Sequence, residues 1–311
     1  MSASEIVQPL PPASAARPFR ASALASTWRD YLTLTKPRIM SLLVLTAVCA
    51  MVAAAGGSPA PVPLAALVLG GALACGGASA LNHVLDRDID RLMGPRTASR
   101  PVAAGRISPA AATVFGLVLS ALSFAVLTEF ANVLSATLSV SGGVFYVVVY
   151  TLVLKRTTSQ NIVIGGAAGA FPPLAGWAAA SGRLGIGAGY LFVIVLLWTP
   201  PHFWALALLL SRHYAAAEVP MMPVVRGNEA TARQVLMYAV ALLAVTLVPG
   251  ALGTFGAIYV IAAAILGVVL CVLAWRLAHD STPAKAGVLF HFSLLYLALL
   301  FAAVAVDAAL R

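Results

Sequence analysis

The chain has 311 residues, of which 61% are hydrophobic and only 9% are charged, and its formal net charge is +9. No water-soluble domain can bury so much apolar surface, so the composition predicts an integral membrane protein and excludes a soluble enzyme. In a membrane protein a basic balance reflects which side the loops face, so the charge does not indicate nucleic-acid binding.

The first segment, residues 1–28, is rich in Pro, Ala and Ser, with scattered charge at Arg17 and Arg20. It has no apolar core ahead of a cleavage site, so we do not predict a secretory signal. We predict a disordered cytosolic tail over residues 1–28, followed by a single membrane domain over residues 29–311.

Nine apolar runs follow, each close to the about 20 residues that a helix needs to cross a bilayer. The predicted fold is therefore an all-α, polytopic membrane bundle of nine transmembrane helices. The predicted spans are approximately Ile39–Ala55, Pro63–Leu81, Pro109–Leu127, Val133–Leu154, Ile162–Ala180, Gly187–Leu210, Val235–Leu252, Ala257–Leu277 and Gly287–Ala308.

The basic residues support this number of spans. With the N-terminus inside, only Arg183 and Arg311 of the 19 Lys and Arg residues fall outside. The inner residues are Arg17, Arg20, Arg29, Lys36, Arg38, Arg87, Arg91, Arg96, Arg100, Arg106, Lys155, Arg156, Arg212, Arg226, Arg233, Arg276 and Lys285. Because cytoplasmic loops carry the excess of Lys and Arg, we predict a cytoplasmic N-terminus. The long polar loops after spans two and six lie on the same side, which is the predicted working face.

The stretch after the second span runs from Asn82 to Asp90 and is the most charged loop of the chain. Asn82, Asp86 and Asp90 recur every four residues, so in a helix they drift by about 40° per step and line one face. Oxygen ligands on one face suit Mg²⁺, which is usually shared between carboxylates and a substrate phosphate. Asp88 lies out of this register and points elsewhere. The alternative is an acidic loop paired with Arg87 and Arg91 beside the membrane.

Several cations accompany these acids. They are Arg91, Arg96, Arg100 and Arg106 in the same loop, and Lys155 and Arg156 at the end of span four. Carboxylates for Mg²⁺ together with several basic groups form a set that is suited to binding a diphosphate. The alternative is that these cations only orient the chain in the membrane.

Spans five and six contain helix breakers. Pro172-Pro173 and Pro200-Pro201 are predicted to interrupt them, which is tolerated where the freed carbonyl groups are buried or line a cavity. His202 lies about eight residues, or roughly 12 Å, before the inner end of span six. An ionisable residue at that depth indicates function. The competing interpretation is a neutral His bonded to a neighbouring helix.

From Tyr31 to the last span the chain carries a series of motifs. They are Leu34-Thr35-Lys36-Pro37-Arg38, the Asn-x-x-x-Asp-x-x-x-Asp stretch at Asn82, Asp86 and Asp90, Arg96-Thr97, Arg100-Pro101, Leu154-Lys155-Arg156-Thr157, residues 161–166, residues 172–177, residues 200–207 and residues 219–225. The acidic motif is typical of the UbiA superfamily of intramembrane prenyltransferases. The Pro-Pro-His-Phe-Trp block and the Val-Pro-Met-x-Pro-Val-Val loop resemble its protohaem IX farnesyltransferase branch.

The resemblance implies transfer of a farnesyl group from farnesyl diphosphate to a vinyl group of haem B, giving haem O. It implies that Asn82, Asp86 and Asp90 bridge Mg²⁺ to the diphosphate, with Lys155 and Arg156 assisting its departure. Water then supplies the hydroxyl group of the product. The resemblance also implies a bacterial inner membrane location and partners in haem A formation or oxidase assembly. We expect a cavity that opens inward or sideways to lipid.

Further candidate contacts to the diphosphate or the haem are His202, Arg38, Arg96, Arg100, Arg212 and Tyr214. Among these, His202 is the first candidate for the haem iron or a propionate. The chain departs from the wider superfamily at the end of span six, where Ser211-Arg212-His213-Tyr214 contains no acid before Glu218. Either Arg212 supplies positive charge in place of a second metal, or Glu218 reaches in.

Two other functions compete with this interpretation. A prenyltransferase for an aromatic quinone precursor predicts a second Asp-x-x-x-Asp motif near residues 202–214, which the sequence lacks. A secondary transporter fits broken spans and a midplane His. However, a transporter need not cluster three metal ligands at one end, and the lack of charge inside most spans disfavours ion coupling.

Overall fold

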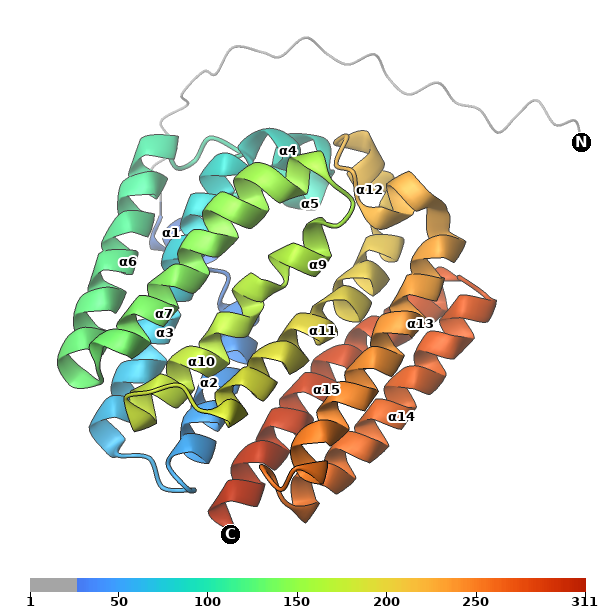
Figure 1. Cartoon of the computed structure of the whole chain (residues 1–311). Helices are drawn as coiled ribbons and strands as arrows, with labels where there is room; N and C mark the ends of the chain where they lie inside the picture. Colours follow the sequence, from blue (N-terminus) through green and yellow to red (C-terminus); the bar gives the residue numbers. More distant parts are fainter. Residues whose placement is uncertain (1–26) are drawn as a thin grey trace, which may run out of the picture.

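The structure is a computed structural model that describes residues 27–311, and within that range every regular element is a helix (Figure 1). The tail predicted over residues 1–28 lies almost wholly outside the described residues. Nine helical stretches in the described part are long and apolar enough to cross a membrane, which confirms the predicted all-α polytopic bundle. The chain is therefore a multi-pass membrane protein.

The spans are built from single helices or from helices joined end to end. The single-helix spans are α2 (Pro37–Ala54), α3 (Pro61–Leu85), α6 (Pro109–Phe130), α11 (Ile186–Leu209), α13 (Met222–Ala251), α14 (Ala257–His279) and α15 (Pro283–Ala309). Span four joins α7 (Val133–Val144), the π-helix η1 (Phe145–Leu154) and α8 (Lys155–Thr157). Span five joins α9 (Asn161–Gly165) and α10 (Ala167–Ser181).

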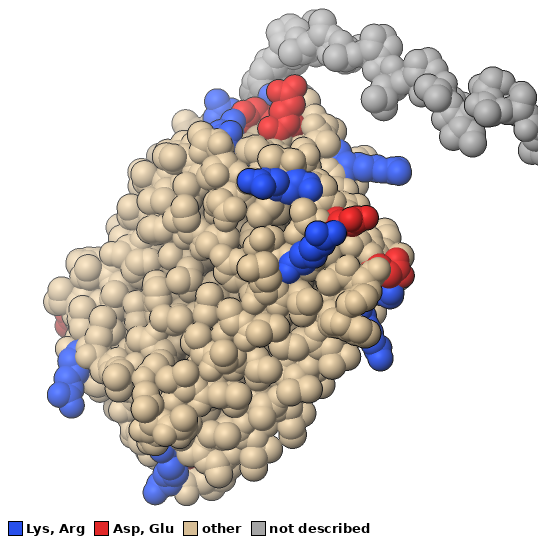
Figure 2. Space-filling model, turned by 45° about the vertical axis from the view of Figure 1, so that its right-hand side comes forward, with Lys and Arg blue, Asp and Glu red and all other residues tan. Residues whose placement is uncertain are grey.

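The remaining helices are short and lie at one end of the bundle. They are α1 (Trp28–Thr35), α4 (Arg87–Leu92), α5 (Pro95–Ala98) and α12 (Ser211–Ala216). Figure 1 places α4, α5 and α12 together at the top, while the C-terminus lies at the opposite end. In Figure 2 most charged side chains on the visible face gather toward that upper end, and only a few Lys or Arg side chains lie lower down. We refer to it as the charged end.

Small residues let the spans approach closely, as their runs along the sequence predict. A side-chain carbon on Gly77 of α3 would lie 2.7 Å from the carbonyl oxygen of Gly116 on α6. A side-chain carbon on Gly176 of α10 would overlap the carbonyl oxygen of Ala47 on α2. Glycine at these positions therefore fixes the spacing of two helix pairs that hold α3 and α2 in the bundle.

The proline pairs do not interrupt their spans where the sequence predicts. Helices α10 and α11 continue through Pro172-Pro173 and Pro200-Pro201. A proline removes backbone hydrogen bonds, but neighbouring helices can hold the segment in place. The break in span five lies instead at the α9–α10 junction around Gly166. Span seven also differs from its predicted bounds, because α13 begins at Met222 rather than at Val235. Pro223 lies in its first turn, and the helix is kinked at Gly227.

Candidate functional site

The acidic motif lies where α3 meets α4 at the charged end. Backbone hydrogen bonds of 2.9 Å from Asp86 N to Asn82 O and 2.8 Å from Asp90 N to Asp86 O keep helical spacing across the junction. As the four-residue repeat predicts, the structure brings Asn82, Asp86 and Asp90 together. Each is no more than 2% exposed, and Asn82 Nδ2 donates to Asp86 Oδ2 at 2.7 Å.

Three cations contact this group, one from the loop after α5 and two from distant parts of the chain. Lys155 Nζ donates to Asp86 Oδ2 at 2.5 Å, and Arg100 donates to Asp90 Oδ1 at 2.5 Å. Both residues were predicted for the site. Lys36 was not, yet its Nζ donates to Asn82 Oδ1 at 2.9 Å. We name these six residues, Lys36, Asn82, Asp86, Asp90, Arg100 and Lys155, the acid–base cluster.

The electrostatics of the cluster favour an anion as well as a cation. Burial lowers the pKa of Lys36 to about 7, and the charges of Arg100 and Lys155 act in the same direction. Burial raises the pKa of Asp90, against the opposing charge of Arg100. The cluster thus holds several buried charges of each sign close together, an arrangement that a bound metal and a bound anion together would help to neutralise.

The cluster contains oxygen atoms that suit a metal. Asp86 Oδ1 and Asp90 Oδ2 are buried and have no hydrogen-bond partner within residues 27–311. Buried carboxylate oxygens nearly always have a partner, so these two atoms are candidates for a hard cation such as Mg²⁺. In the described part of the chain no three His, Cys, Asp or Glu side chains converge on one point. A metal here would therefore rest on two carboxylates, the Asn82 amide and ligands from outside the chain.

The π-helix η1 brings span four against the cluster. The Thr151 hydroxyl donates to Tyr146 O, five residues back, at 2.9 Å, and it accepts from Asn82 Nδ2 at 3.1 Å. The rings of Tyr146 and Tyr150 stack with centroids 5.6 Å apart. Because Lys155 follows directly after η1, this helix positions both Thr151 and Lys155. The apolar pattern of Phe145–Leu154 does not distinguish a π-helix from an α-helix.

Tyr214, predicted for the site, lies on α12 and is buried. Burial raises its pKa to about 12, and the charges of Arg100 and Asp86 also act on its hydroxyl. The loop that carries α12 contacts the loop after α3, since a side-chain carbon on Gly94 would lie 2.9 Å from His213 Cδ2. Gly94 has a φ of 125°, which favours glycine. The two long loops therefore meet beside the acid–base cluster.

Other predicted residues do not join the cluster. Arg156 donates to both Asp88 oxygens at 2.7 and 2.8 Å, and this pair lowers the pKa of Asp88 to about 2. Asp88 thus points away from the motif, as its register predicts. Arg38, Arg96 and Arg212 are exposed, and within the described residues none bonds to Asp86 or Asp90. Glu218 is also exposed, with a φ of 53°.

The alternative interpretation of the acidic loop named two ion pairs that the structure does not contain. Arg87 donates to the carbonyl oxygen of Val84 at 3.0 Å, and Arg91 donates to that of Ala103 at 3.0 Å. Neither reaches an acid of the motif in the described structure. The loop acids are instead paired with Arg100, Lys155 and Arg156, two of which come from span four.

His202 lies deep in α11, away from these ion pairs. Its Nδ1 lies 2.7 Å from the hydroxyl of Ser293 on α15, and its ring stacks on Trp198 at 4.3 Å and on Phe290 at 4.9 Å. Trp198 Nε1 also donates to Ser293 O at 2.8 Å. These contacts match the interpretation of a His bonded to a neighbouring helix.

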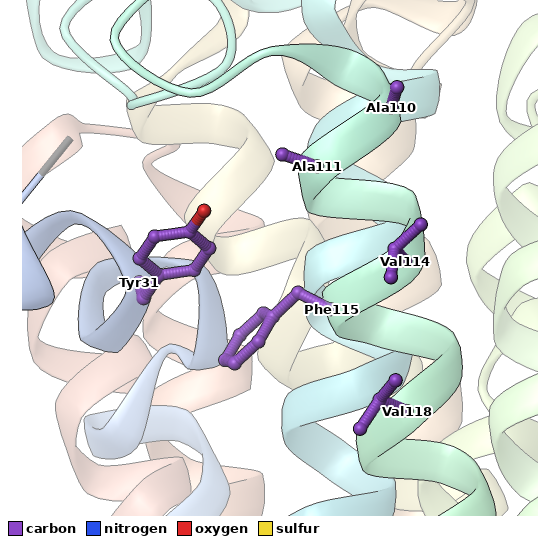
Figure 3. Close-up of a pocket in the computed structure, with 6 residues that line it drawn as sticks. All are labelled: Tyr31, Ala110, Ala111, Val114, Phe115 and Val118. Atoms are coloured by element: carbon purple, nitrogen blue, oxygen red, sulfur yellow. The ribbon is translucent and has the colours of Figure 1, made fainter. Parts of the chain in front are cut away.

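Two surface hollows lie on the flanks of the bundle. Figure 3 shows one of them, where Tyr31 and Phe115 face each other beside the valine side chains of α6. Their ring centroids are 5.0 Å apart. The second lies between α13 and α14 and is lined by apolar residues, Cys271 and Trp275. Both linings lack acids and bases, so neither hollow offers the chemistry of the acid–base cluster.

The sequence of this chain matches a known protein family and several of its members. The model of the UbiA prenyltransferase family matches residues 43–303. The chain is 52% identical to a protoheme IX farnesyltransferase of Gloeobacter violaceus, with 91% of this chain and 93% of the relative aligned. It is 47% identical to one of Deinococcus radiodurans over 91% of this chain and 94% of the relative. A Thermus thermophilus relative with the same name is 50% identical, but the chain covers only 46% of its length.

Solved structures share the fold. A digeranylgeranylglyceryl phosphate synthase structure has a TM-score of 0.75 and 18% identity, over 91% of this chain and 99% of that one. A UbiA homologue from Archaeoglobus fulgidus, bound to DMAPP and Mg²⁺, has a TM-score of 0.67 and 16% identity, over 89% and 99%. With the family match, the sequence relatives and the shared fold agreeing, this chain belongs to the UbiA prenyltransferase family.

Proposed function

We propose that this protein transfers a farnesyl group from farnesyl diphosphate to a vinyl group of haem B, giving haem O. The observation that carries the proposal is the pair of buried, unpartnered oxygens, Asp86 Oδ1 and Asp90 Oδ2, beside Lys36, Arg100 and Lys155. This pair lies in a chain that is about half identical to protoheme IX farnesyltransferases along nearly their full length.

Asn82, Asp86 and Asp90 are the residues that would hold Mg²⁺. The ion, when bound, supplies positive charge that stabilises the departing diphosphate. The unpartnered oxygens fit this role, since they face no protein donor in the described structure. The acidic motif supplies ligands for one such site, and Glu218 on the α12 loop is exposed rather than directed at the cluster.

Lys36, Arg100 and Lys155 bind the diphosphate in this proposal. Each now donates to a side chain of the acidic motif, so it can exchange that partner for a phosphate oxygen when substrate arrives. Basic groups aimed at a leaving group commonly contribute a large share of catalysis in a water-excluded site. Arg156 has a different role, because its bond to Asp88 fixes the start of α4 against span four.

The aromatic wall of the site protects the allylic cation. Tyr146 adjoins the cluster through Thr151, which bonds to both Tyr146 O and Asn82, and Tyr214 is buried on α12. Aromatic faces stabilise cations, and a buried site keeps bulk water from the farnesyl cation. The apolar farnesyl chain then extends from the charged end into the bundle or the adjoining lipid.

The charged end faces the cytoplasm of a bacterial cell in this proposal, with the N-terminus on the same side. The support is the distribution of Lys and Arg, since only Arg183 and Arg311 fall in segments on the other side. Both substrates combine a long apolar part with an anionic head. We therefore place their entry at the lipid boundary, and the recipient of haem O among the proteins of haem A formation or oxidase assembly.

The test uses purified protein in detergent with haem B, labelled farnesyl diphosphate and Mg²⁺. Wild type should give a heavier, labelled haem, and Asp86→Asn should not. An aromatic quinone precursor in place of haem B should give no product, and labelled substrate should not be transported into vesicles that contain the protein. If wild type forms no prenylated haem, the proposed function is wrong.

A further inference from the structure

Ser79 and His83 form a second polar pair on α3 that the cluster does not use. Ser79 is 7% exposed and His83 is 1% exposed. The Ser79 hydroxyl and both ring nitrogens of His83 have no hydrogen-bond partner within residues 27–311. Buried polar groups in proteins nearly always have a partner, and an unsatisfied one is most costly inside a membrane. Three such atoms on one helix indicate a missing ligand.

The pair lies next to the metal-binding face. Residues four apart on a helix are separated by about 40° around the axis and about 6 Å along it, so Ser79 and His83 share a face. Asn82 lies about 60° around the helix from Ser79, on the side that contacts Thr151 and Lys36. The charges of Lys36 and Arg100 act on the His83 ring. Ser79 is one turn deeper in the membrane than the acidic motif.

We propose that Ser79 and His83 hold the water molecule that supplies the hydroxyl group of the product, an inference that rests on the proposed function. A hydroxyl and an imidazole together offer donors and acceptors, and a buried water requires two to four such partners. The position also fits. The diphosphate binds at the charged end and the farnesyl chain extends inward, so the reacting carbon lies on the deeper side of the cluster.

The reaction needs one water molecule at a defined moment. The C1–O bond of farnesyl diphosphate breaks, and its electron pair leaves with the diphosphate. The terminal vinyl carbon of haem B then bonds to C1, which leaves the positive charge on the vinyl carbon attached to the porphyrin. A lone pair of the held water forms the new C–O bond at that carbon. One water proton passes to the departed diphosphate, so charge and atoms balance.

Holding this water solves a conflict within the site. Free water would capture the farnesyl cation before the haem does, so bulk water must be excluded. A single molecule bound by Ser79 and His83 is available to the later cation, but its position is fixed. Without it, the later cation loses a proton from the neighbouring carbon and becomes an alkenyl haem, lighter than haem O by one water.

The experiment measures the ratio of alkenyl to hydroxylated prenyl haem by mass spectrometry. The variants are His83→Leu and Ser79→Ala, which remove the polar atoms, and His83→Asn, which restores a donor and an acceptor. The matched control is Ser123→Ala on α6, since Ser123 is also fully buried but its hydroxyl donates to Gly70 O at 2.7 Å. All variants are assayed with haem B, farnesyl diphosphate and Mg²⁺.

We expect the alkenyl fraction to rise about fivefold or more in His83→Leu and Ser79→Ala, in line with the loss of one hydrogen bond. His83→Asn should return it toward the wild-type value, and Ser123→Ala should not change it. A wild-type product ratio in both His83→Leu and Ser79→Ala would overturn the water site, even if turnover falls. If His83→Leu does not fold, the Ser79→Ala ratio decides. If wild type makes no prenylated haem, both the proposed function and the water site are wrong.

Discussion

Lys155 Nζ lies 2.5 Å from Asp86 Oδ2, although 69 residues separate the two in the chain. Both side chains are at most 10% exposed, so this ion pair is buried where span four meets α3. The second oxygen of Asp86 has no protein partner in the described structure. One carboxylate thus neutralises a fixed cation and still presents an oxygen for a metal.

Lys155→Met should leave a buried, uncompensated carboxylate. Breaking one partner of a buried pair typically costs about 3 kcal/mol or more of unfolding free energy. The double variant Lys155→Met with Asp86→Asn should regain most of that stability, because the orphan charge is gone. The single variant should lose about 100-fold or more in kcat because Lys155 acts on the diphosphate. The double variant should be inactive as well, because it also lacks a proposed Mg²⁺ ligand. Thermal unfolding in detergent and steady-state assays check this, and a double variant no more stable than the single one would contradict it.

Lys36 and Arg38 provide a paired comparison two residues apart. Lys36 bonds to Asn82, whereas Arg38 is exposed. Lys36→Met should raise KM for farnesyl diphosphate about tenfold, because a charge-assisted bond to a phosphate is lost. Arg38→Met should stay within about twofold of wild type. Equal effects of the two substitutions would show that Lys36 has no special contact with the substrate.

Magnesium should stabilise the folded protein through the acidic motif. At a free concentration about 100 times Kd, a ligand that binds only the native state adds about 2.7 kcal/mol. The Tm of wild type should therefore rise with Mg²⁺ and farnesyl diphosphate, and removal by a chelator should reverse the rise. Asp90→Asn should lose the shift. Asp88→Asn is the matched control, since Asp88 is paired with Arg156, and it should keep the shift.

Gly94 should tolerate no side chain. Its φ of 125° costs a non-glycine residue about 1 kcal/mol or more, and the added carbon would also press on His213. Gly94→Ala should therefore lower Tm and activity, since it separates the two loops beside the cluster. Adding His213→Ala should recover only the part that comes from the contact. Full recovery in the double variant would mean that the backbone conformation at Gly94 carries no strain.

The acidic motif illustrates what the sequence can predict. The four-residue spacing of Asn82, Asp86 and Asp90 depends only on helix geometry, and the structure brings the three together. Lys36 is not among the residues predicted for the site, although the proline that follows it is a local signal in the sequence. A residue before proline disfavours the right-handed α conformation, so a helix end is expected at Lys36, which adopts the left-handed conformation with a φ of 50°. That turn directs its side chain to Asn82.

Contacts between helices that are far apart in the sequence depend on tertiary packing, so the local sequence does not predict them. The partner of His202 is Ser293, 91 residues further along the chain, so its identity could not be predicted from span six. The predicted breaks at the two proline pairs are wrong for a similar reason. Their local cost is real, but the packing of α10 and α11 in the bundle outweighs it, and the break in span five falls at Gly166.

The π-helix η1 makes span four unusually sensitive to its own length. A π-turn accommodates one more residue than an α-turn, so deleting one residue from Phe145–Leu154 would let the segment relax to an α-helix. Thr151 and Lys155 keep their direction toward α3 only while that extra residue is present. In this span the direction of two polar side chains depends on the number of backbone residues and not on the identity of any one side chain. Substitutions that keep the length of the chain would therefore not reveal this dependence.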